Sequence, residues 1–118
     1  MLKKTTVFLA LSCFIKISFA QIPAYFDINT KYKTALELVE KGKYAAASSI
    51  FYEVERIKSI PNSLQESNSN ISQLKINSEY YRALCALELN NDDAEQLFKK
   101  FIKQHPESSK TKQAYFQV

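Results

Sequence analysis

One apolar pattern occurs twice in this chain, 47 residues apart. Residues 47–54 read Ala-x-x-Ile-Phe-x-x-Val, and residues 94–101 read Ala-x-x-Leu-Phe-x-x-Phe. This spacing places each set on one stripe of an α-helix. Self-similarity at such a period is typical of stacked repeats, in which a helix pair cannot bury its apolar face alone and neighbouring pairs share a core. The pattern therefore predicts an all-α fold of antiparallel helix-pair repeats.

The remaining helices are predicted from the spacing of apolar residues between residues that end helices. A first helix is expected to begin at Asp27 or Asn29 and to end at Gly42, and a third to end at Asn90-Asn91, where either Asn can cap the fourth. Residues 62–72 are rich in Ser and Asn, which predicts either a loop or a loosely wound polar start to the third helix. Residues 107–118 are expected to open a fifth helix, with three inward side chains: Ala114, Tyr115 and Val118.

The first 20 residues have the layout of a secretory signal peptide. Lys3 and Lys4 precede an uncharged apolar stretch, and Ser18 and Ala20 are small residues placed three positions and one position before Gln21. This layout predicts cleavage after Ala20 and export. Lys16 is an unusual residue so late in such a signal, and an uncleaved N-terminal anchor or an amphipathic helix is the alternative.

Two other interpretations of the leader are less favoured. Cys13 could be acylated in a lipoprotein, but Leu11 lies one place from where a lipobox would want it. A transmembrane helix needs about 20 consecutive apolar residues, and Lys16 interrupts the run. Membrane association is therefore expected only if the leader is retained or lipidated. The predicted helical domain is residues 21–118.

The charge of the chain gives no support for nucleic-acid binding. The three lysines of the leader have no acidic counterpart, so residues 21–118 carry 13 basic and 12 acidic side chains. Nucleic-acid binding would need a dense basic stripe, whereas these charges alternate in sign. The single glycine also argues against a phosphate-cradling loop.

Few residues could support catalysis or bind a metal ion. His105 is the only histidine, and the Pro106 that follows predicts a position at a helix end. Cys85 lies among apolar residues, which predicts a buried, unreactive thiol. Asp92, Asp93 and Glu95 are best explained as acidic residues at a helix start. The sequence therefore predicts no enzyme activity, no cofactor and no metal site.

The repeated residues resemble the tetratricopeptide consensus over roughly residues 29–118. The first repeat has a small residue in its first helix, a Gly-x-Tyr turn and Ala-x-x-x-Phe in its second helix: Ala35, Leu38, Gly42, Tyr44, Ala47, Phe51 and Val54. The second repeat resembles it at Ala83, Ala94, Phe98, Phe101 and Pro106. The chain departs from the consensus in its period, which is usually about 34 residues, in having Asn91-Asp92-Asp93 instead of Gly-x-Tyr, and in lacking Trp.

Residues 101–108 (FIKQHPES) with 114–116 (AYF) are also similar to exported bacterial tetratricopeptide proteins of the outer-membrane-assembly and cell-division-coordinator type. This similarity implies a periplasmic or outer-membrane-associated protein. The expected array has about two repeats and the first helix of a third, as the N-terminal piece of a longer protein.

The resemblance implies a non-catalytic scaffold of the cell envelope that binds a protein or peptide and no small-molecule substrate. The first helix of each pair would line the groove, with four candidate residues: Lys31, Thr34, Tyr81 and Arg82. Two alternatives stay open. The repeats could be the N-terminal arm of a larger exported enzyme, or a structural module that self-associates.

Overall fold

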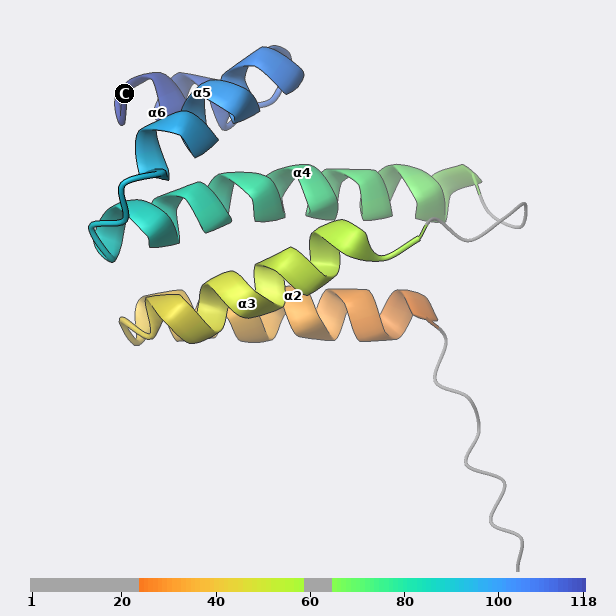
Figure 1. Ribbon diagram of the computed structural model, residues 1–118. Coiled ribbons are helices and arrows are strands. Elements are labelled where there is room, and N and C mark those ends of the chain that lie inside the picture. The colour runs from red at the N-terminus through yellow and green to blue at the C-terminus, as the bar shows by residue number, and fades with distance from the viewer. Residues whose placement is uncertain (1–23, 59–64) are drawn as a thin grey trace, which may run out of the picture.

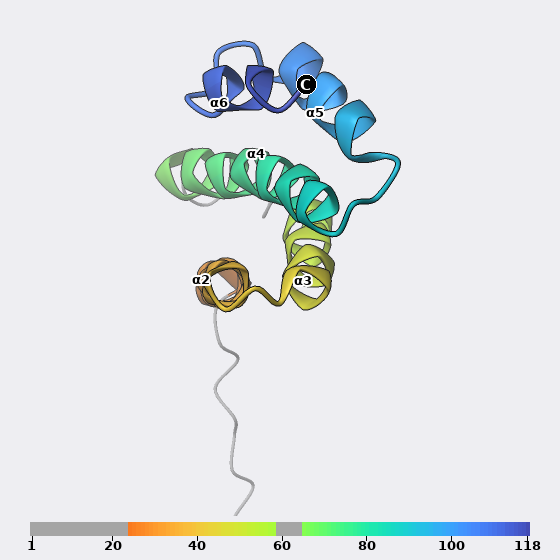
Figure 2. The ribbon, with the colours of Figure 1, turned by 90° about the vertical axis from the view of Figure 1, so that its left-hand side faces the viewer.

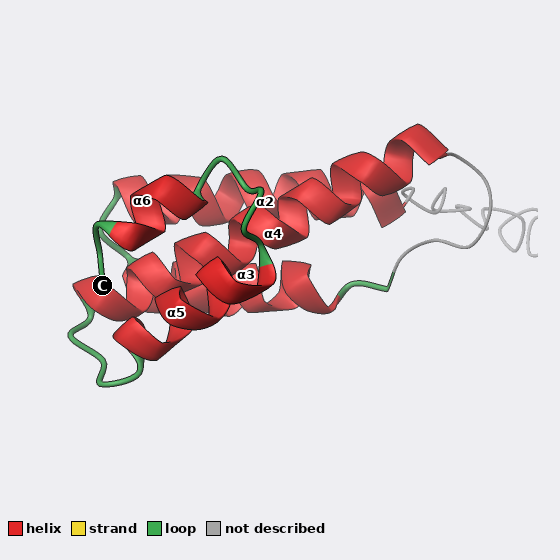
Figure 3. Ribbon diagram, turned by 90° about the horizontal axis from the view of Figure 1, so that it is seen from above, coloured by secondary structure: helices red, strands yellow, loops and turns green. Residues whose placement is uncertain are grey.

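The computed structural model describes residues 24–58 and 65–118. Every regular element in those ranges is an α-helix (Figure 3). In chain order they are α2 (Ala24–Glu40), α3 (Tyr44–Arg56), α4 (Gln65–Glu88), α5 (Ala94–Gln104) and α6 (Thr111–Tyr115). The predicted all-α fold is confirmed. None of the described helices is long and apolar enough to cross a membrane. The predicted leader, with Cys13 and the cleavage site after Ala20, lies outside the described residues.

The helices stack as two antiparallel pairs followed by a short fifth helix. α3 packs against both α2 and α4, α2 also touches α4, and α5 packs against α4 and α6. The pair α2–α3 therefore lies against the pair α4–α5 through α3 and α4 (Figure 1). Seen end-on, α2 and α6 lie to one side, α3 and α5 to the other, and α4 lies between them (Figure 2). This is the repeat-like arrangement that the 47-residue pattern predicts.

Each helix pair buries alanine and phenylalanine side chains at equivalent positions. In the first pair Ala35, Ala47 and Phe51 are fully buried in one cluster. In the second pair Ala83 and Phe98 are equally buried, and they cluster with Tyr80, Phe101 and Ala114. The small alanines let the paired helices approach, and the phenylalanine fills the space between them. The two repeated stripes, at residues 47–54 and 94–101, are thus confirmed as core-facing.

α4 joins the two cores. Its Cys85 packs with the first pair, whereas its Tyr80 and Ala83 pack with the second. Tyr81 contacts both clusters, and its ring stacks on Phe51 with centroids 5.4 Å apart. Because residues of one helix complete both cores, neither pair can bury its apolar face without the other.

The two turns between paired helices use the same backbone geometry. Gly42 has a φ of 69° and Asn90 a φ of 55°, the left-handed conformation that ends many helices. In both turns the backbone N–H of the left-handed residue donates a hydrogen bond to the carbonyl three residues earlier, and the N–H of the next residue donates to the carbonyl five residues earlier. The bonds run from Gly42 to Val39 and from Lys43 to Leu38 in the first turn, and from Asn90 to Leu87 and from Asn91 to Ala86 in the second. Asn90, not the predicted Asn91-Asp92-Asp93, therefore takes the place of Gly42.

Two predicted helix starts are wrong. α2 begins at Ala24, so Asp27 lies in its first turn rather than at its cap. Neither Asn90 nor Asn91 caps α5, because Asn90 terminates α4 in the left-handed conformation. Asp93 immediately precedes α5 and makes no side-chain capping bond.

The Ser/Asn-rich stretch forms the start of α4 from Gln65 onward, so for these residues the polar-helix alternative is confirmed. Ile71 anchors this polar turn, because it is buried against Ile28 and Val54 of the first pair. Gln73 also donates a hydrogen bond to Asn77 one turn later. Ile71, with the partly buried Leu74, therefore holds the otherwise polar start of α4 on α2 and α3.

The C-terminal helix is shorter than predicted. α6 spans one turn, and its buried residues are Thr111 and Ala114. Tyr115 and Val118, expected to face inward with Ala114, are 64% and 50% exposed. Tyr115 is the last residue of α6 and Val118 lies beyond it, so the helical spacing that the prediction assumed does not extend to Val118.

Candidate functional site

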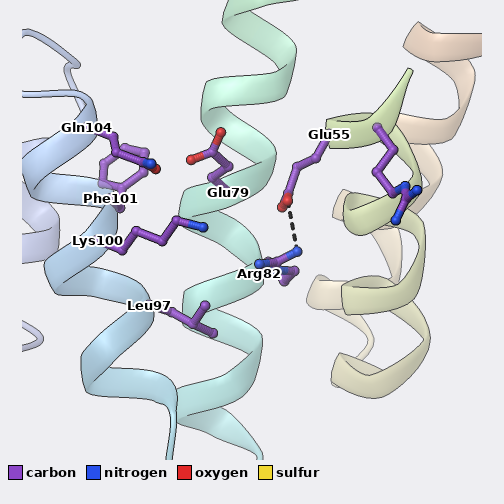
Figure 4. Close-up of a pocket in the computed structure, with 8 residues that line it drawn as sticks. Glu55, Glu79, Arg82, Leu97, Lys100, Phe101 and Gln104 are labelled. Carbon is purple, nitrogen blue, oxygen red and sulfur yellow. Dashed lines mark hydrogen bonds and ion pairs between the residues drawn. The ribbon is translucent and has the colours of Figure 1, made fainter. Parts of the chain in front are cut away.

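A charged cavity lies at the junction of the two helix pairs, where side chains of α3, α4 and α5 point toward one another (Figure 4). Its volume is about 270 Å³. Six polar or charged residues line this junction cavity: Glu55 and Arg56 of α3, Glu79 and Arg82 of α4, Lys100 and Gln104 of α5. Leu97 and Phe101 of α5 supply apolar surface. Three consecutive helices therefore contribute side chains to a single hollow.

Glu55 is the most buried charged group of the cavity. Its side chain is 14% exposed, and its Oε2 accepts a hydrogen bond from Arg82 Nη1 at 2.8 Å. Its other oxygen, Oε1, is buried and has no hydrogen-bond partner among the described residues. Loss of solvation raises the pKa of Glu55 to about 7, although Arg82 and Lys100 lower it, and Glu79 adds to the increase. The carboxylate thus retains an unused acceptor.

Glu79 lies near Glu55, and its carboxylate contacts His105. Its Oε2 lies 2.9 Å from His105 Nε2, just beyond the end of α5. The His105 ring in turn lies against Phe101, with centroids 5.3 Å apart. Lys100, an exposed residue of α5, extends toward the space between Glu79 and Arg82 (Figure 4). The two acids therefore approach the cavity from α3 and α4, and Lys100 approaches it from α5.

An exposed tyrosine stands beside the cavity with two arginines around it. Tyr52 is 45% exposed. Arg56 donates a hydrogen bond to its hydroxyl at 2.7 Å, and the guanidinium carbons of Arg56 and Arg82 lie 5.4 and 5.2 Å from its ring centroid. These are cation–π distances. The cluster of Tyr52, Arg56 and Arg82 extends the cavity onto the outer surface of α3.

The four groove residues predicted from the sequence do not form one surface. Of them, Arg82 alone lines the cavity. Lys31 pairs with Glu53 at 2.8 Å, and the Thr34 hydroxyl donates to the Thr30 carbonyl of its own helix. Tyr81 packs with aromatic rings of both pairs, and Lys110 lies 5.1 Å from its ring centroid. The cavity lies between the second helices α3 and α5, and α4, the first helix of the second pair, also lines it.

The residues considered for catalysis lie apart from one another. Cys85 is buried in the core, as predicted, and burial raises the pKa of its thiol to about 11. His105 follows α5, as predicted, and contacts Glu79. Glu95 pairs with Lys99 on the surface of α5. Among residues 24–58 and 65–118, no three His, Cys, Asp or Glu side chains group as metal ligands do.

Of the predicted signature residues, Phe101 lines the junction cavity, and those that are buried form the core beneath it. Phe51, Val54 and Phe98 are buried, and they fix the faces of α3 and α5 that carry the charged residues. Glu55, Glu79 and Lys100 were not predicted as site residues, because in the sequence each looks like an ordinary exposed charge. The available signal was position: Glu55 and Arg56 directly follow the buried Val54, at the end of α3.

No protein-family model, curated protein or solved structure matches this chain.

Proposed function

We propose that this chain is a non-catalytic protein-interaction scaffold of tetratricopeptide type. The supporting observation is the exposed Tyr52 with Arg56 and Arg82 beside a cavity built from three helices. Tyr and Arg are enriched among residues that dominate binding energy at protein interfaces. Their rings and guanidinium planes are held by contacts within the chain, so less side-chain entropy is lost when a partner binds.

The tetratricopeptide assignment is supported by the burial of its signature positions. Ala35, Ala47 and Phe51 are fully buried in the first pair, and Ala83 and Phe98 in the second. Gly42 ends the first helix in the left-handed conformation, where the resemblance places a glycine. The period of 47 residues stays longer than the usual value of about 34, because α4 starts with an extra polar segment.

We further propose export to the bacterial cell envelope, in the periplasm or at the outer membrane. This proposal is supported by the leader-like residues 1–20 and by the similarity of residues 101–108 and 114–116 to envelope repeat proteins. N-terminal sequencing of the secreted product tests it. A start at Gln21 supports processing after Ala20, and any other start contradicts that site.

Affinity capture from envelope extracts tests the interaction role. The wild-type chain is compared with the double variant Tyr52→Ala/Arg56→Ala and with a matched control, Tyr115→Ala/Lys112→Ala, which removes an exposed tyrosine and a basic residue from α6. We expect the wild-type chain and the control to enrich the same protein. The Tyr52→Ala/Arg56→Ala variant should lose it by about tenfold or more, as truncation of interface anchors does.

Two results would contradict the proposal. One is that no protein is enriched above background by the wild-type chain. The other is that both double variants lose the captured protein equally while their helical circular dichroism is unchanged, because the Tyr52 cluster would then have no special part in binding.

A further inference from the structure

Both acidic side chains of the junction cavity are already engaged within the chain. Glu55 accepts a hydrogen bond from Arg82 at 2.8 Å, and its other carboxylate oxygen is buried. The carboxylate of Glu79 lies 2.9 Å from the ring of His105. Because two acidic and three basic residues line the cavity, these pairings leave its lining with more positive than negative charge.

The surplus positive charge lies on Arg56 of α3 and Lys100 of α5. Both residues line the cavity, and both are exposed. Among the described residues, neither forms an ion pair with an acidic side chain. Lys100 acts on Glu55 at longer range, where it lowers the pKa of that carboxyl. Arg56 and Lys100 can therefore pair with an anion from outside the chain.

Arg56 is held in place by a group that does not cancel its charge. Its guanidinium donates a hydrogen bond to the Tyr52 hydroxyl at 2.7 Å, and its guanidinium carbon lies 5.4 Å from the Tyr52 ring centroid. The remaining guanidinium N–H groups can bind a carboxylate in the two-pronged geometry that arginine favours. Because Arg56 is already oriented, less side-chain entropy is lost when an anion binds.

The surroundings of Arg56 suit a single carboxylate side chain rather than an extended polyanion. A nucleic acid would need a dense basic stripe, whereas α3 and α5 also carry acidic residues on their surfaces, Glu53 and Glu95. The cavity has a volume of about 270 Å³, and Leu97 and Phe101 supply apolar surface within it. The methylene groups of an acidic side chain can lie against this surface.

We propose that the mouth of the junction cavity binds a glutamate or aspartate side chain of a partner segment, with Arg56 as the main contact and Lys100 as a weaker one. This inference rests on the proposed interaction role and specifies the chemistry of the partner. The Tyr52 cluster then has a defined part in recognition, since it orients the arginine that receives the carboxylate.

Binding of an acidic side chain is coupled to proton uptake at Glu55. Glu55 faces Arg82 and Glu79 of α4 and Lys100 of α5, and loss of solvation raises its pKa to about 7. A carboxylate bound nearby opposes the ionisation of Glu55, so the bound form takes up a proton more readily. Protonation of His105, which contacts Glu79, acts in the same direction. The affinity should therefore rise as the pH falls from 8 to 6.

The test uses short peptides as probes, so that no natural partner is required. Rhodamine-labelled tetraglutamate, tetraglutamine and tetralysine are titrated with the full chain at pH 6 and pH 8, and binding is followed by fluorescence anisotropy. We expect tetraglutamate to bind about tenfold more tightly than tetraglutamine, the factor for one charge-assisted hydrogen bond. Tetralysine should bind no better than tetraglutamine, and tetraglutamate should bind about threefold more tightly at pH 6 than at pH 8.

Matched variants assign the binding to the mouth of the cavity. Arg56→Gln should weaken tetraglutamate binding about tenfold, and Lys100→Gln about threefold. Lys33→Gln makes the same change of charge at an exposed position of α2, which does not line the cavity, and should leave binding unchanged. Glu55→Gln should reduce the dependence of binding on pH. Circular dichroism checks that each variant keeps its helices.

Three results would overturn the proposal. The first is that tetraglutamate binds no more tightly than tetraglutamine. The second is that Lys33→Gln weakens binding as much as Arg56→Gln, because the attraction would then be to the charge of the whole chain. The third is that inorganic phosphate displaces the labelled probe more fully than unlabelled tetraglutamate does at the same concentration, because the cations would then form a phosphate site.

The outcome is separable from that of the interaction role. If the capture experiment succeeds and tetraglutamate does not bind, the acidic specificity is wrong and the scaffold role stands. If tetraglutamate binds and no protein is captured, the cavity is a carboxylate site and the scaffold role is wrong.

Discussion

Tyr32 and Phe51 in the first helix pair meet edge-on, with ring centroids 5.9 Å apart and an interplanar angle of 66°, and Tyr80 and Phe98 in the second pair meet at the same distance and angle. The first helices of the pairs are offset by 48 residues and the second helices by 47. The difference of one residue is absorbed in the turns at Gly42 and Asn90. The apolar framework is therefore truly repeated.

The polar positions of the same two pairs differ. Lys31 and Glu53 form an ion pair between α2 and α3, with exposures of 35% and 54%. Their equivalents in the second pair are Glu79 and Lys100, with the charges reversed, and both line the junction cavity. The second pair differs because α3 lies against its α4, so Glu79 and Lys100 line a cavity to which α3 adds Glu55 and Arg56. The candidate site is thus a product of stacking.

Equal losses of unfolding free energy from matched substitutions in the two cores would be the strongest support for the equivalence of the two helix pairs. Phe51→Ala and Phe98→Ala each remove a fully buried ring, and each should lower the free energy of unfolding by about 3–5 kcal/mol. The two losses should agree within about 1 kcal/mol in urea unfolding followed by circular dichroism. A much smaller loss for either would show that the pairs are not equivalent. Phe→Leu at both positions keeps the comparison measurable if the alanine variants do not fold.

The pH dependence of the unfolding free energy is expected to report on Glu55 at the junction cavity. The pKa of Glu55 is about 7 in the folded chain, above its ordinary value of 4.5, so the folded state binds the proton more tightly. Its contribution to stability is full below pH 4.5 and is lost as the pH rises through 7. The full loss amounts to about 3 kcal/mol.

The measurement is urea unfolding of the wild-type chain and of Glu55→Gln between pH 5 and 8. The difference in unfolding free energy between them should change across this range, because the variant lacks the titrating group. Glu53→Gln serves as the control, since Glu53 lies on an exposed face. Parallel profiles for the wild-type chain and Glu55→Gln would rule out a raised pKa at this site.

Substitutions in the two turns sharpen the comparison at smaller energies. Gly42→Ala meets no steric contact from an added Cβ, so its cost is that of placing alanine at a φ of 69°, about 1 kcal/mol. Asn90→Gly should stabilise the chain by about 0.5 kcal/mol, because glycine adopts this conformation more easily. Thermal unfolding of both variants checks the opposite signs, and destabilisation by Asn90→Gly would contradict the shared turn geometry.

The smallest effect is expected at the surface pair of the first repeat. A double-mutant cycle on Lys31→Ala and Glu53→Ala should give a coupling below about 1 kcal/mol that fades with added salt. A salt-independent coupling well above this value would mean that the exposed pair of the first repeat is as important as the residues at the junction.

The sequence predicted the core well and the site poorly. Ala47, Phe51, Ala94 and Phe98 repeat at fixed spacing, so burial follows from helical periodicity alone. The end of the third helix was predicted at Asn90-Asn91, but Asn90 was not predicted as the equivalent of Gly42, because asparagine is a weaker signal than glycine for the left-handed conformation. Periodicity also does not say which exposed charges a neighbouring helix will cover. Glu55, Glu79 and Lys100 meet only after the pairs stack, so no local pattern could bring them together.

Site-specific photo-crosslinking tests most directly the claim that recognition occurs at the junction. A benzoylphenylalanine residue replaces Lys100 at the cavity or Glu53 at the equivalent position of the first pair, and adducts formed in envelope extracts are identified by mass spectrometry. We predict that position 100 captures one discrete protein and position 53 does not. Capture at position 53 alone, or of the same proteins from both positions, would contradict the account.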